Sequence, residues 1–525
     1  MTMTKRRTKK YLAARIICSM VLGAYLIGGY CEPVAWGHPD GNGAKIQGNS
    51  VTADAPESSA WGHYAKATGN YSTAWGTNTT ASGTESSAWG YKTTASGEDA
   101  TAWGIWTTAD GFNSTSWGTE TIAKGEDATV WGIETKALGE TSTAWGAGTT
   151  ASATRATAWG VDTTASGNRS TAWGQLAEAG GENSTAWGTN TRASAKQATA
   201  WGSRANASGH TSTAWGWLTE ASARRATAWG NASVASGAAS TAWGGYYYHP
   251  DEDPEAEIYH KGGTASGIAS TAFGMETTAS ASGATAWGGY FDDGAKESYK
   301  GGTASGLAST AFGIETEASG KAATAWGNKS VASGDYSTAF GDSSQALAEN
   351  SLAALGGIVE KDATNGIAIG KGSTVSAANS IAIGTGLKVS GKNSGAIGDP
   401  TIVNGDNSYS VGNNNEVTGS NTFVFGNNVK TGAKNAVVLG DGSEGVDNAV
   451  SVGAKGKERQ IKNVAPGTDD TDATTVKQVK EMIEAGGGGA DLTQVNHRIS
   501  NLDSKINKVG AGAAALAALH PLDYG

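Results

Sequence analysis

A tryptophan recurs every 14 residues, fourteen times in succession, from Trp61 to Trp243. Each stands in nearly the same phrase, such as Ser72-Thr73-Ala74-Trp75-Gly76, and a second phrase such as Thr79-Thr80-Ala81-Ser82-Gly83 separates successive copies. Self-similarity at a fixed period outweighs any other reading of a fold. A 14-residue unit is too short for a pair of helices but fits two short strands and two turns. The repeat therefore predicts an all-β solenoid, which presents a surface or spans a distance more often than it catalyses.

Each repeat forms one rung of the solenoid, and the position just before its glycine, which tryptophan occupies up to Trp243, can be followed further along the chain. It is occupied in turn by Phe273, Trp287, Phe312, Trp326, Phe340, Leu355, Ile369, Ile383, Ile397, Val411, Phe425, Leu439 and Val452. Trp36 would begin one more rung. At ~4.8 Å per stacked strand, the rungs from Trp61 onward predict a shaft about 130 Å long. The spacing widens to 30 residues after Trp243 and to 25 after Trp287, which predicts loops inserted into a coil that then resumes its register.

Strand alternation places Thr and Trp of the phrase Thr-Ala-Trp on one face and Ala on the other. A residue that recurs in register and is replaced only by Phe, Ile, Leu or Val is typical of a core, so we expect the tryptophans to be core residues. The alternative is an exposed aromatic platform that stacks on sugars. Trp106 and Trp217 lie out of register, and we expect them to be exposed.

The composition divides the chain into segments. Residues 1–31 hold a basic region and an apolar run from Tyr11 to Gly29, the pattern of an export signal. Residues 32–345 form a tryptophan-type roll, and residues 346–453 form an aliphatic one. Residues 454–489 contain a helix expected from about Thr474 to Ala485, capped by Asp472 or a neighbouring threonine, and then a glycine linker.

Residues 490–510 carry a heptad pattern that predicts a short coiled coil. Isoleucine-rich seams favour coiled coils of three or more helices over those of two, so we expect a homotrimer. The seam residues are Leu492, Val495, Ile499, Leu502, Ile506 and Val509.

Charge and cysteine content narrow the function. The formal net charge is −10, which argues against nucleic acid as a partner, since phosphate binding needs a basic stripe. The two cysteines, Cys18 and Cys31, both lie near the N-terminus, so the roll has no disulfide framework, zinc-cysteine site or cysteine nucleophile.

Two insertions, residues 244–263 and 288–302, are the strongest candidates for ligand binding. Both begin Gly-Gly-aromatic and return through Tyr or His to Lys-Gly-Gly-Thr-Ala-Ser-Gly. Tyrosine-rich loops suit recognition because they offer rigid contact area with a polar tip, although a strut against a neighbouring chain would have the same composition. The candidate ligand-binding residues are Tyr246, Tyr247, Tyr248, Tyr259, Tyr290, Phe291 and Tyr299. His249 and His260 with Asp251, Glu252 and Asp253 match no strong metal-ligand spacing, so we predict no metal and no cofactor.

Three features together resemble the trimeric autotransporter adhesins of Gram-negative bacteria, the YadA-like family. The rung Asn379-Ser380-Ile381-Ala382-Ile383-Gly384 is similar to the family's head phrase. The segment 461–467, Ile-Lys-Asn-Val-Ala-Pro-Gly, with Thr471-Asp472-Ala473-Thr474, resembles the family's neck. Residues 509–523 are similar to the run that opens the membrane anchor, so residues 511–525 would be the start of that anchor.

The resemblance implies a left-handed parallel β-roll in each chain, with three rolls side by side. It implies a bacterial surface adhesin, exported to the cell surface and outer membrane, that holds a host cell-surface or extracellular-matrix protein or glycan, or other bacteria. It also implies an outer-membrane barrel whose strands would follow Gly525 and are missing from this chain. Tryptophan in place of the family's isoleucine through most of the head suggests bulkier packing on the same topology.

Two other functions fit a β-solenoid. A polysaccharide-degrading enzyme would need convergent carboxylates, whereas the acids here are scattered over rung turns, as at Glu85, Glu98, Glu120 and Glu126. A structural or ice-binding solenoid would use the repeated threonines as a flat ladder. The neck, the heptads and the anchor-like segment favour a non-catalytic adhesin with no catalytic residues.

Overall fold

The computed structural model describes residues 44–248, 258–292, 297–485 and 492–517. The chain divides into two compact units, residues 1–451 and residues 452–525, which are treated separately below. The predicted export signal, residues 1–31, lies outside the described residues.

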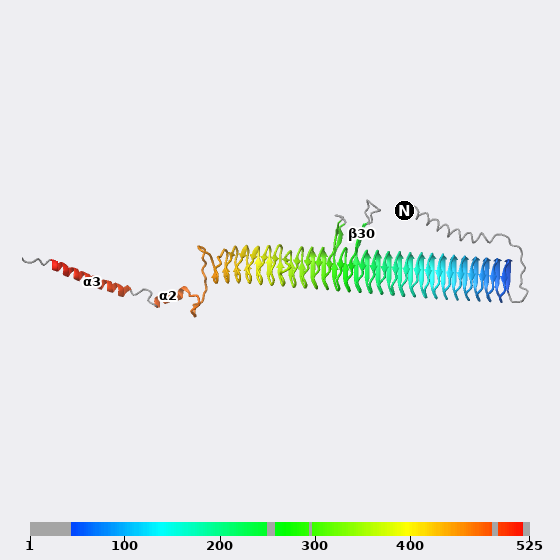
Figure 1. The fold of residues 1–525 in the computed structure, drawn as a ribbon, viewed down its shortest axis with the longest axis horizontal. Helices are drawn as coiled ribbons and strands as arrows, with labels where there is room; N and C mark the ends of the chain where they lie inside the picture. Colours follow the sequence, from blue (N-terminus) through cyan, green and yellow to red (C-terminus); the bar gives the residue numbers. More distant parts are fainter. Residues whose placement is uncertain (1–43, 249–257, 293–296, 486–491, 518–525) are drawn as a thin grey trace, which may run out of the picture. The chain divides into compact units, whose positions relative to one another are not determined.

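The first unit contains a parallel β-solenoid (Figure 1). Each turn contributes one long and one short strand, and the long strands form a 28-stranded sheet in which each strand pairs in parallel with the strand one turn later. Trp61, for example, is opposite Trp75, and Ala60 is opposite Ala74. The prediction of a solenoid with 14-residue turns is confirmed.

The tryptophan region is regular. Its long strands are five residues each and recur every 14 residues from β3 (Ser59–His63) to β27 (Thr227–Asn231). Its short strands are two residues each and recur at the same interval from β4 (Lys66–Ala67) to β28 (Val234–Ala235). The turn before them, β1 (Lys45–Asn49) and β2 (Thr52–Ala53), puts Gln47 opposite Trp61. The sequence did not predict this turn because only Gly48 matches the repeated phrase.

The remaining strands continue both sheets to the end of the unit. The long-strand sheet continues with β29 (Thr241–Gly244), β33 (Thr271–Phe273), β35 (Thr285–Trp287), β39 (Thr310–Ile314), β41 (Thr324–Asn328), β43 (Thr338–Phe340), β45 (Leu352–Ala354), β47 (Ile367–Ile369), β49 (Ile381–Gly384), β51 (Gly395–Gly398), β53 (Tyr409–Val411), β55 (Phe423–Phe425), β57 (Val437–Leu439) and β58 (Val450–Ser451). The short-strand sheet continues with β32 (Thr264–Ala265), β34 (Thr278–Ala279), β38 (Thr303–Ala304), β40 (Glu317–Ala318), β42 (Val331–Ala332), β44 (Gln345–Ala346), β46 (Ile358–Val359), β48 (Thr374–Val375), β50 (Lys388–Val389), β52 (Thr401–Val403), β54 (Asn415–Val417) and β56 (Lys430–Thr431).

The interior of the roll is built from small side chains. The alanine of each long strand, such as Ala74, and the alanine of each short strand, such as Ala81, have no exposed surface. Serine and threonine side chains such as Ser72 and Thr79 fill the corners and are equally buried. In the aliphatic region the short strands supply valine instead, as at Val375. Two facing sheets joined by such tight turns leave room for little more than these residues.

The turns require left-handed backbone, and the two regions meet this requirement differently. In the aliphatic region asparagines such as Asn379, Asn393 and Asn407 have φ between 53° and 56°. Asparagine tolerates this conformation because its short amide can hydrogen-bond locally. The Asn379 side chain donates to that of Asn393 at 3.1 Å, and Asn393 donates to Asn407 at the same distance. The asparagines therefore form a ladder of hydrogen bonds along one edge of the roll.

The second unit contains helices α2 (Val476–Ala485) and α3 (Leu492–Ala517). The Thr475 hydroxyl accepts a hydrogen bond from the Gln478 backbone N–H at 3.2 Å, and the Gln478 side chain accepts one from the Thr475 N–H at 3.0 Å. This reciprocal pair is a capping box, so of the two predicted caps the neighbouring threonine is right and Asp472 is wrong. The Asp472 carboxylate instead accepts the backbone N–H groups of Thr468 and Asp469.

Helix α3 includes the predicted heptads and continues through the residues that resemble the start of an anchor, as far as Ala517. No helix within the described part of the chain is both long and apolar enough to cross a membrane.

Candidate adhesive surface

The tryptophans lie on the outside of the single roll. In each phrase Thr-Ala-Trp the alanine is buried, the threonine is half-buried and the indole is exposed, as at Thr199, Ala200 and Trp201. The alternation of faces is confirmed, but the expectation that tryptophan forms the core is wrong for the single chain. The reason is geometric, because an interior that is just filled by alanine from both sheets cannot also hold indoles.

The exposed indoles form a continuous stack. From Trp103 to Trp243 consecutive ring centroids are 4.7–5.0 Å apart, and their planes differ by 1–6°. This separation follows from the spacing of adjacent strands in a sheet, since each turn contributes one ring. About 40% of the Trp201 side chain remains exposed despite the stacking. We call this line of residues, Trp61 to Phe340, the indole ladder.

The glycine after each tryptophan permits this close stacking of turns. Gly76 has φ of +134°, which other residues rarely adopt. A Cβ atom added there would lie 1.9 Å from the carbonyl oxygen of Gly90 in the next turn. The pair Trp-Gly thus combines an outward ring with a backbone that only glycine can form.

The aliphatic region extends the same outer line. Ile369 is opposite Ile383, which is opposite Ile397, and the last two are exposed. One predicted member is wrong: Ala354, not Leu355, is opposite Phe340 and Ile369. Leu355 takes a left-handed turn position instead, with φ of 54°.

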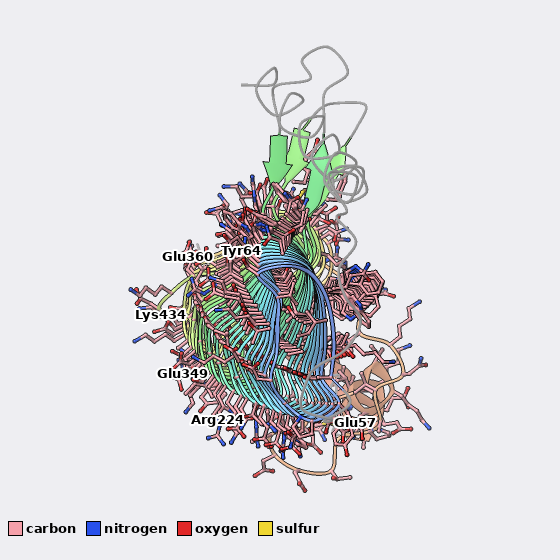
Figure 2. The ribbon with its side chains drawn as sticks, turned by 90° about the vertical axis from the view of Figure 1, so that its right-hand side faces the viewer. Glu57, Tyr64, Arg224, Glu349, Glu360 and Lys434 are labelled. Atoms are coloured by element: carbon pink, nitrogen blue, oxygen red, sulfur yellow. The ribbon has the colours of Figure 1, made fainter. Side chains whose placement is uncertain are left out.

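The two insertions are antiparallel hairpins. Strand β30 (Tyr246–Tyr248) pairs with β31 (Ile258–His260), and β36 (Tyr290–Asp292) pairs with β37 (Glu297–Tyr299). The roll resumes across each of them, because β29 pairs directly with β33 and β35 with β39. The hairpins leave from turns two apart, about 10 Å along the roll at the usual strand spacing. Both rise from the same edge of the roll (Figure 2).

The structure places every predicted ligand-binding residue on these hairpins. Tyr246, Tyr247 and Tyr248 lie on β30, Tyr259 on β31, Tyr290 and Phe291 on β36, and Tyr299 on β37. The Tyr290 and Tyr299 rings stack at the base of the second hairpin, with centroids 4.9 Å apart and planes 19° apart. Nearly half of Tyr290 is exposed. Of the residues considered for a metal, His249 and Asp251–Asp253 lie outside the described residues.

Glycines hold the first hairpin against the roll. Gly245 has φ of +98°, and a Cβ atom there would lie 1.9 Å from the carbonyl oxygen of Asn231. On the return strand, a Cβ atom at Gly263 would lie 2.4 Å from the carbonyl oxygen of Ala272. The Gly-Gly and Lys-Gly-Gly signatures seen in the sequence are thus the points where hairpin and roll touch.

The two tryptophans outside the repeat register differ in exposure. Trp106 is exposed, as predicted, and the Lys92 ammonium lies 5.1 Å from its ring centroid and 5.5 Å from that of Tyr91. Trp217 is only half exposed, so its predicted exposure is not met in full. Within the described residues, no group of three or more His, Cys, Asp or Glu side chains could hold a metal ion.

The heptad side chains of α3 from Val495 to Val509 are exposed in the structure of the single chain. Val495, Ile499, Leu502, Ile506 and Val509 are all exposed on an amphipathic helix. Apolar residues repeated at steps of three and four on one helix favour contact with another helix.

Comparison with known proteins gives two findings. The chain matches the family described as the YadA head domain repeat over residues 53–79, 81–104, 137–219, 304–330, 332–354, 362–386 and 404–428. It is also similar to the crystal structure of the collagen-binding domain of the Yersinia adhesin YadA, with 25% identity over 46% of this chain and 97% of that one, at a TM-score of 0.20. No curated protein matches the chain.

Proposed function

Because this chain belongs, by its head repeats, to the YadA-like trimeric autotransporter adhesins, we propose that it is a homotrimeric, non-catalytic adhesin of the bacterial surface. Its three rolls would pack through their indole ladders, and its hairpins would contact the ligand. The ligand would be a host cell-surface or extracellular-matrix protein or glycan. Export and outer-membrane anchoring would present the head outward.

The indole ladder is the observation that carries the trimer. It is a continuous apolar strip along the same face of the long-strand sheet, and its residues from Trp103 to Trp243 are each 39–46% exposed. Soluble monomers rarely expose contiguous apolar patches larger than a few hundred Å², and larger ones mark interaction surfaces. Ile383 and Ile397 continue the line in the aliphatic region, so a single contact could run the length of the roll.

Helix α3 supports the same stoichiometry independently. Its exposed seam is the one the heptads predict, with isoleucine at Ile499 and Ile506. Isoleucine in the seam favours coiled coils of more than two helices. Trimeric packing of α3 and trimeric packing of the rolls would therefore each require three chains.

The hairpins are the best candidates for the ligand contact. They are the only described segments that leave the otherwise uninterrupted roll, and they carry a stacked tyrosine pair, Tyr290 and Tyr299, with Tyr290 exposed. Three copies in a trimer would repeat this surface, and simultaneous engagement raises avidity without any new contact.

Light scattering on the purified full chain tests the stoichiometry. At about 0.5 M salt, where contacts between exposed charges are screened, the proposal requires a mass three times that of the chain, and a monomer or dimer would overturn it. Retention on immobilised collagen and on cultured cells, compared between the full chain and a variant lacking residues 246–261, tests the hairpin. Reduced retention with unchanged mass and circular dichroism supports a ligand-binding hairpin. Loss of the trimer would identify the hairpin as a strut instead.

A further inference from the structure

The roll has a second exposed surface, formed by the bends that follow each short strand. Each bend places two residues outward, such as Glu126 and Asp127, and the second of them has a left-handed backbone, with φ of 53° at Asp127. We call this line the second-turn edge. Glu57, Arg224 and Glu349 mark it along the roll in Figure 2.

Charge is segregated along this edge. Its first part is acidic, with Glu85, Glu98, Asp99, Glu126, Asp127 and Glu140, all exposed. Its next part is basic, with Arg155, Arg169, Lys196, Arg224 and Arg225, all exposed, together with His210. One carboxylate, Glu182, lies within the basic part and is paired with Lys196 at 2.9 Å.

This arrangement is unfavourable within one chain. Elsewhere the roll places opposite charges one turn apart, as in Glu178 with Arg192 at 3.5 Å and Glu416 with Lys430 at 3.6 Å. On the acidic part, Glu85 is one turn from Asp99 and Glu126 is one turn from Glu140, at the spacing of stacked strands, about 5 Å, where like charges repel. The neutral bend at Asn113 separates the two groups, and the Asn113 side chain donates a hydrogen bond to Asp127 at 2.7 Å. Arg155 has no ion pair in the described part of the chain, whereas Arg169 is attracted by Glu182 without forming a close ion pair. A partner of complementary charge outside the chain would relieve this repulsion.

We propose that this partner is a second copy of the same edge, running in the opposite direction. A two-fold axis between the bend that ends at Thr141 and the bend that ends at Arg155 would bring the acidic bends at Asp99, Asp127 and Glu140 of one head onto basic bends of the other. The facing pairs would be Glu140 with Arg155, Asp127 with Arg169, Asp99 with Lys196, Glu85 with His210, and Tyr71 with Arg225. In the remaining bend pair Asn113 faces Asn183, and Glu182 in the same bend is already paired with Lys196 of its own chain.

The register explains why a copy of the chain fits better than an unrelated partner. Both parts of the edge have the same 14-residue spacing, so pairing one bend aligns all twelve bends from Tyr71 to Arg225. At the usual strand spacing this contact would run for about 55 Å. From Trp103 to Trp229 successive indole planes differ by 1–6°, for example 3° from Trp145 to Trp159, so the turns in that part of the roll stack with little rotation. A polyanion would satisfy the basic part alone and leave the acidic part unexplained.

The pairing has a direct consequence for adhesion. Antiparallel heads suit proteins that project toward each other from two facing surfaces. Because the contact uses only the second-turn edge, it depends neither on the indole ladder nor on the hairpins.

Reversing the charges of the paired bends by substitution in the full chain tests the pairing. At about 20 mM salt the wild-type assembly should have twice the mass that it has at about 0.5 M salt, because salt screens exposed charge pairs. Arg155→Glu with Arg169→Glu should raise the dissociation constant of the pairing at least tenfold, as should Asp127→Arg with Glu140→Arg. Glutamate is compatible with the bend, since Glu85 has the same left-handed backbone. Mixing the two variants should restore the doubled mass, because each supplies the charge the other lacks.

The matched control is Lys92→Glu with Arg204→Glu, which makes the same charge change at left-handed positions of the other turn and should leave the doubling intact. Unchanged circular dichroism verifies the fold of each variant.

The proposal is overturned if the mass of the wild-type assembly never doubles, if that of the first variant still doubles, or if that of the mixture fails to double. Retention on a sulfated polysaccharide without doubling would also overturn it and assign the basic part to a polyanion. Failure of the trimer would change the mass at about 0.5 M salt, whereas failure of the pairing would remove the doubling at about 20 mM salt, so the two proposals fail separately.

Discussion

The indole rings of Trp187 and Trp201 lie with centroids 4.8 Å apart and planes 1° apart, although 14 residues separate them in the chain. Their strands pair in parallel, which fixes Trp187 opposite Trp201 and leaves both rings on the outside of the roll. The ring that the repeat preserves is therefore available to another chain.

Replacing both tryptophans with alanine should weaken the trimer and leave the single roll folded. Covering the roughly 100 Å² that each residue leaves exposed is worth about 2.5 kcal/mol per ring at ~25 cal/mol per Å². In sedimentation equilibrium the double variant should therefore be monomeric at protein concentrations at which the wild-type chain is still trimeric. Its circular dichroism should be unchanged. Trp106→Ala, which alters an exposed ring outside the ladder, is the control. Loss of β-structure would show that the ladder holds the roll itself together.

The buried alanines should behave in the opposite way. Ala200 has no exposed surface and is opposite Ala186 and Ala214 in the adjacent turns, so Ala200→Phe would force the two sheets apart. Overpacking of this kind costs about 1–3 kcal/mol or more, so the thermal midpoint should fall by several degrees. Ala200→Val is the matched control and should be tolerated, since Val130 is buried at the equivalent position. Equal midpoints for the two variants would contradict an interior filled by alanine.

The sequence predicted the repeat, its parallel register and the alternation of faces, because all three follow from a fixed period and the geometry of a strand. It did not predict which face was inside. A recurring tryptophan and a recurring alanine are both regular, and only the narrow distance between the two sheets shows that alanine fits within. The charge segregation of the second-turn edge was also missed. Glu126 and Arg169 look like scattered surface charges until the turns are stacked.

Glycines of the long strands should be irreplaceable. Gly76→Ala would place a Cβ atom 1.9 Å from the Gly90 carbonyl oxygen at φ of +134°, so neither the backbone nor the spacing of turns can accommodate it. Strained backbone alone costs about 1–3 kcal/mol, and the clash adds to this. Gly180→Ala is the control, because the nearest atom would be 3.7 Å away. Local opening in hydrogen exchange around residues 62–90 should appear in the first variant, and its absence would contradict the packing described here.

The seam of α3 should control assembly without affecting the roll. Ile499→Asn with Ile506→Asn places two polar groups in one seam, whose isoleucines are 54% and 59% exposed in the single chain. We expect a lower trimer fraction in sedimentation velocity, because buried amides without partners oppose association. Asn501→Ala, on the same helix but outside the heptad positions, should have no effect. An unchanged trimer in the double variant would show that the rolls alone are sufficient.

The turn before α2 should loosen in acid. The backbone N–H of Thr468 and then that of Asp469 hold the pKa of the Asp472 carboxyl below its ordinary value. A carboxyl with a lowered pKa in the folded chain contributes stability that is complete above its ordinary pKa and is lost as the pH falls through the lowered one. Hydrogen exchange at Thr468 and Asp469 should therefore speed up, relative to the intrinsic rate, over that acidic interval. Asp472→Asn should show fast exchange at neutral pH as well, whereas Asp470→Asn should behave as wild type. Identical pH profiles for all three chains would show that Asp472 does not order this turn.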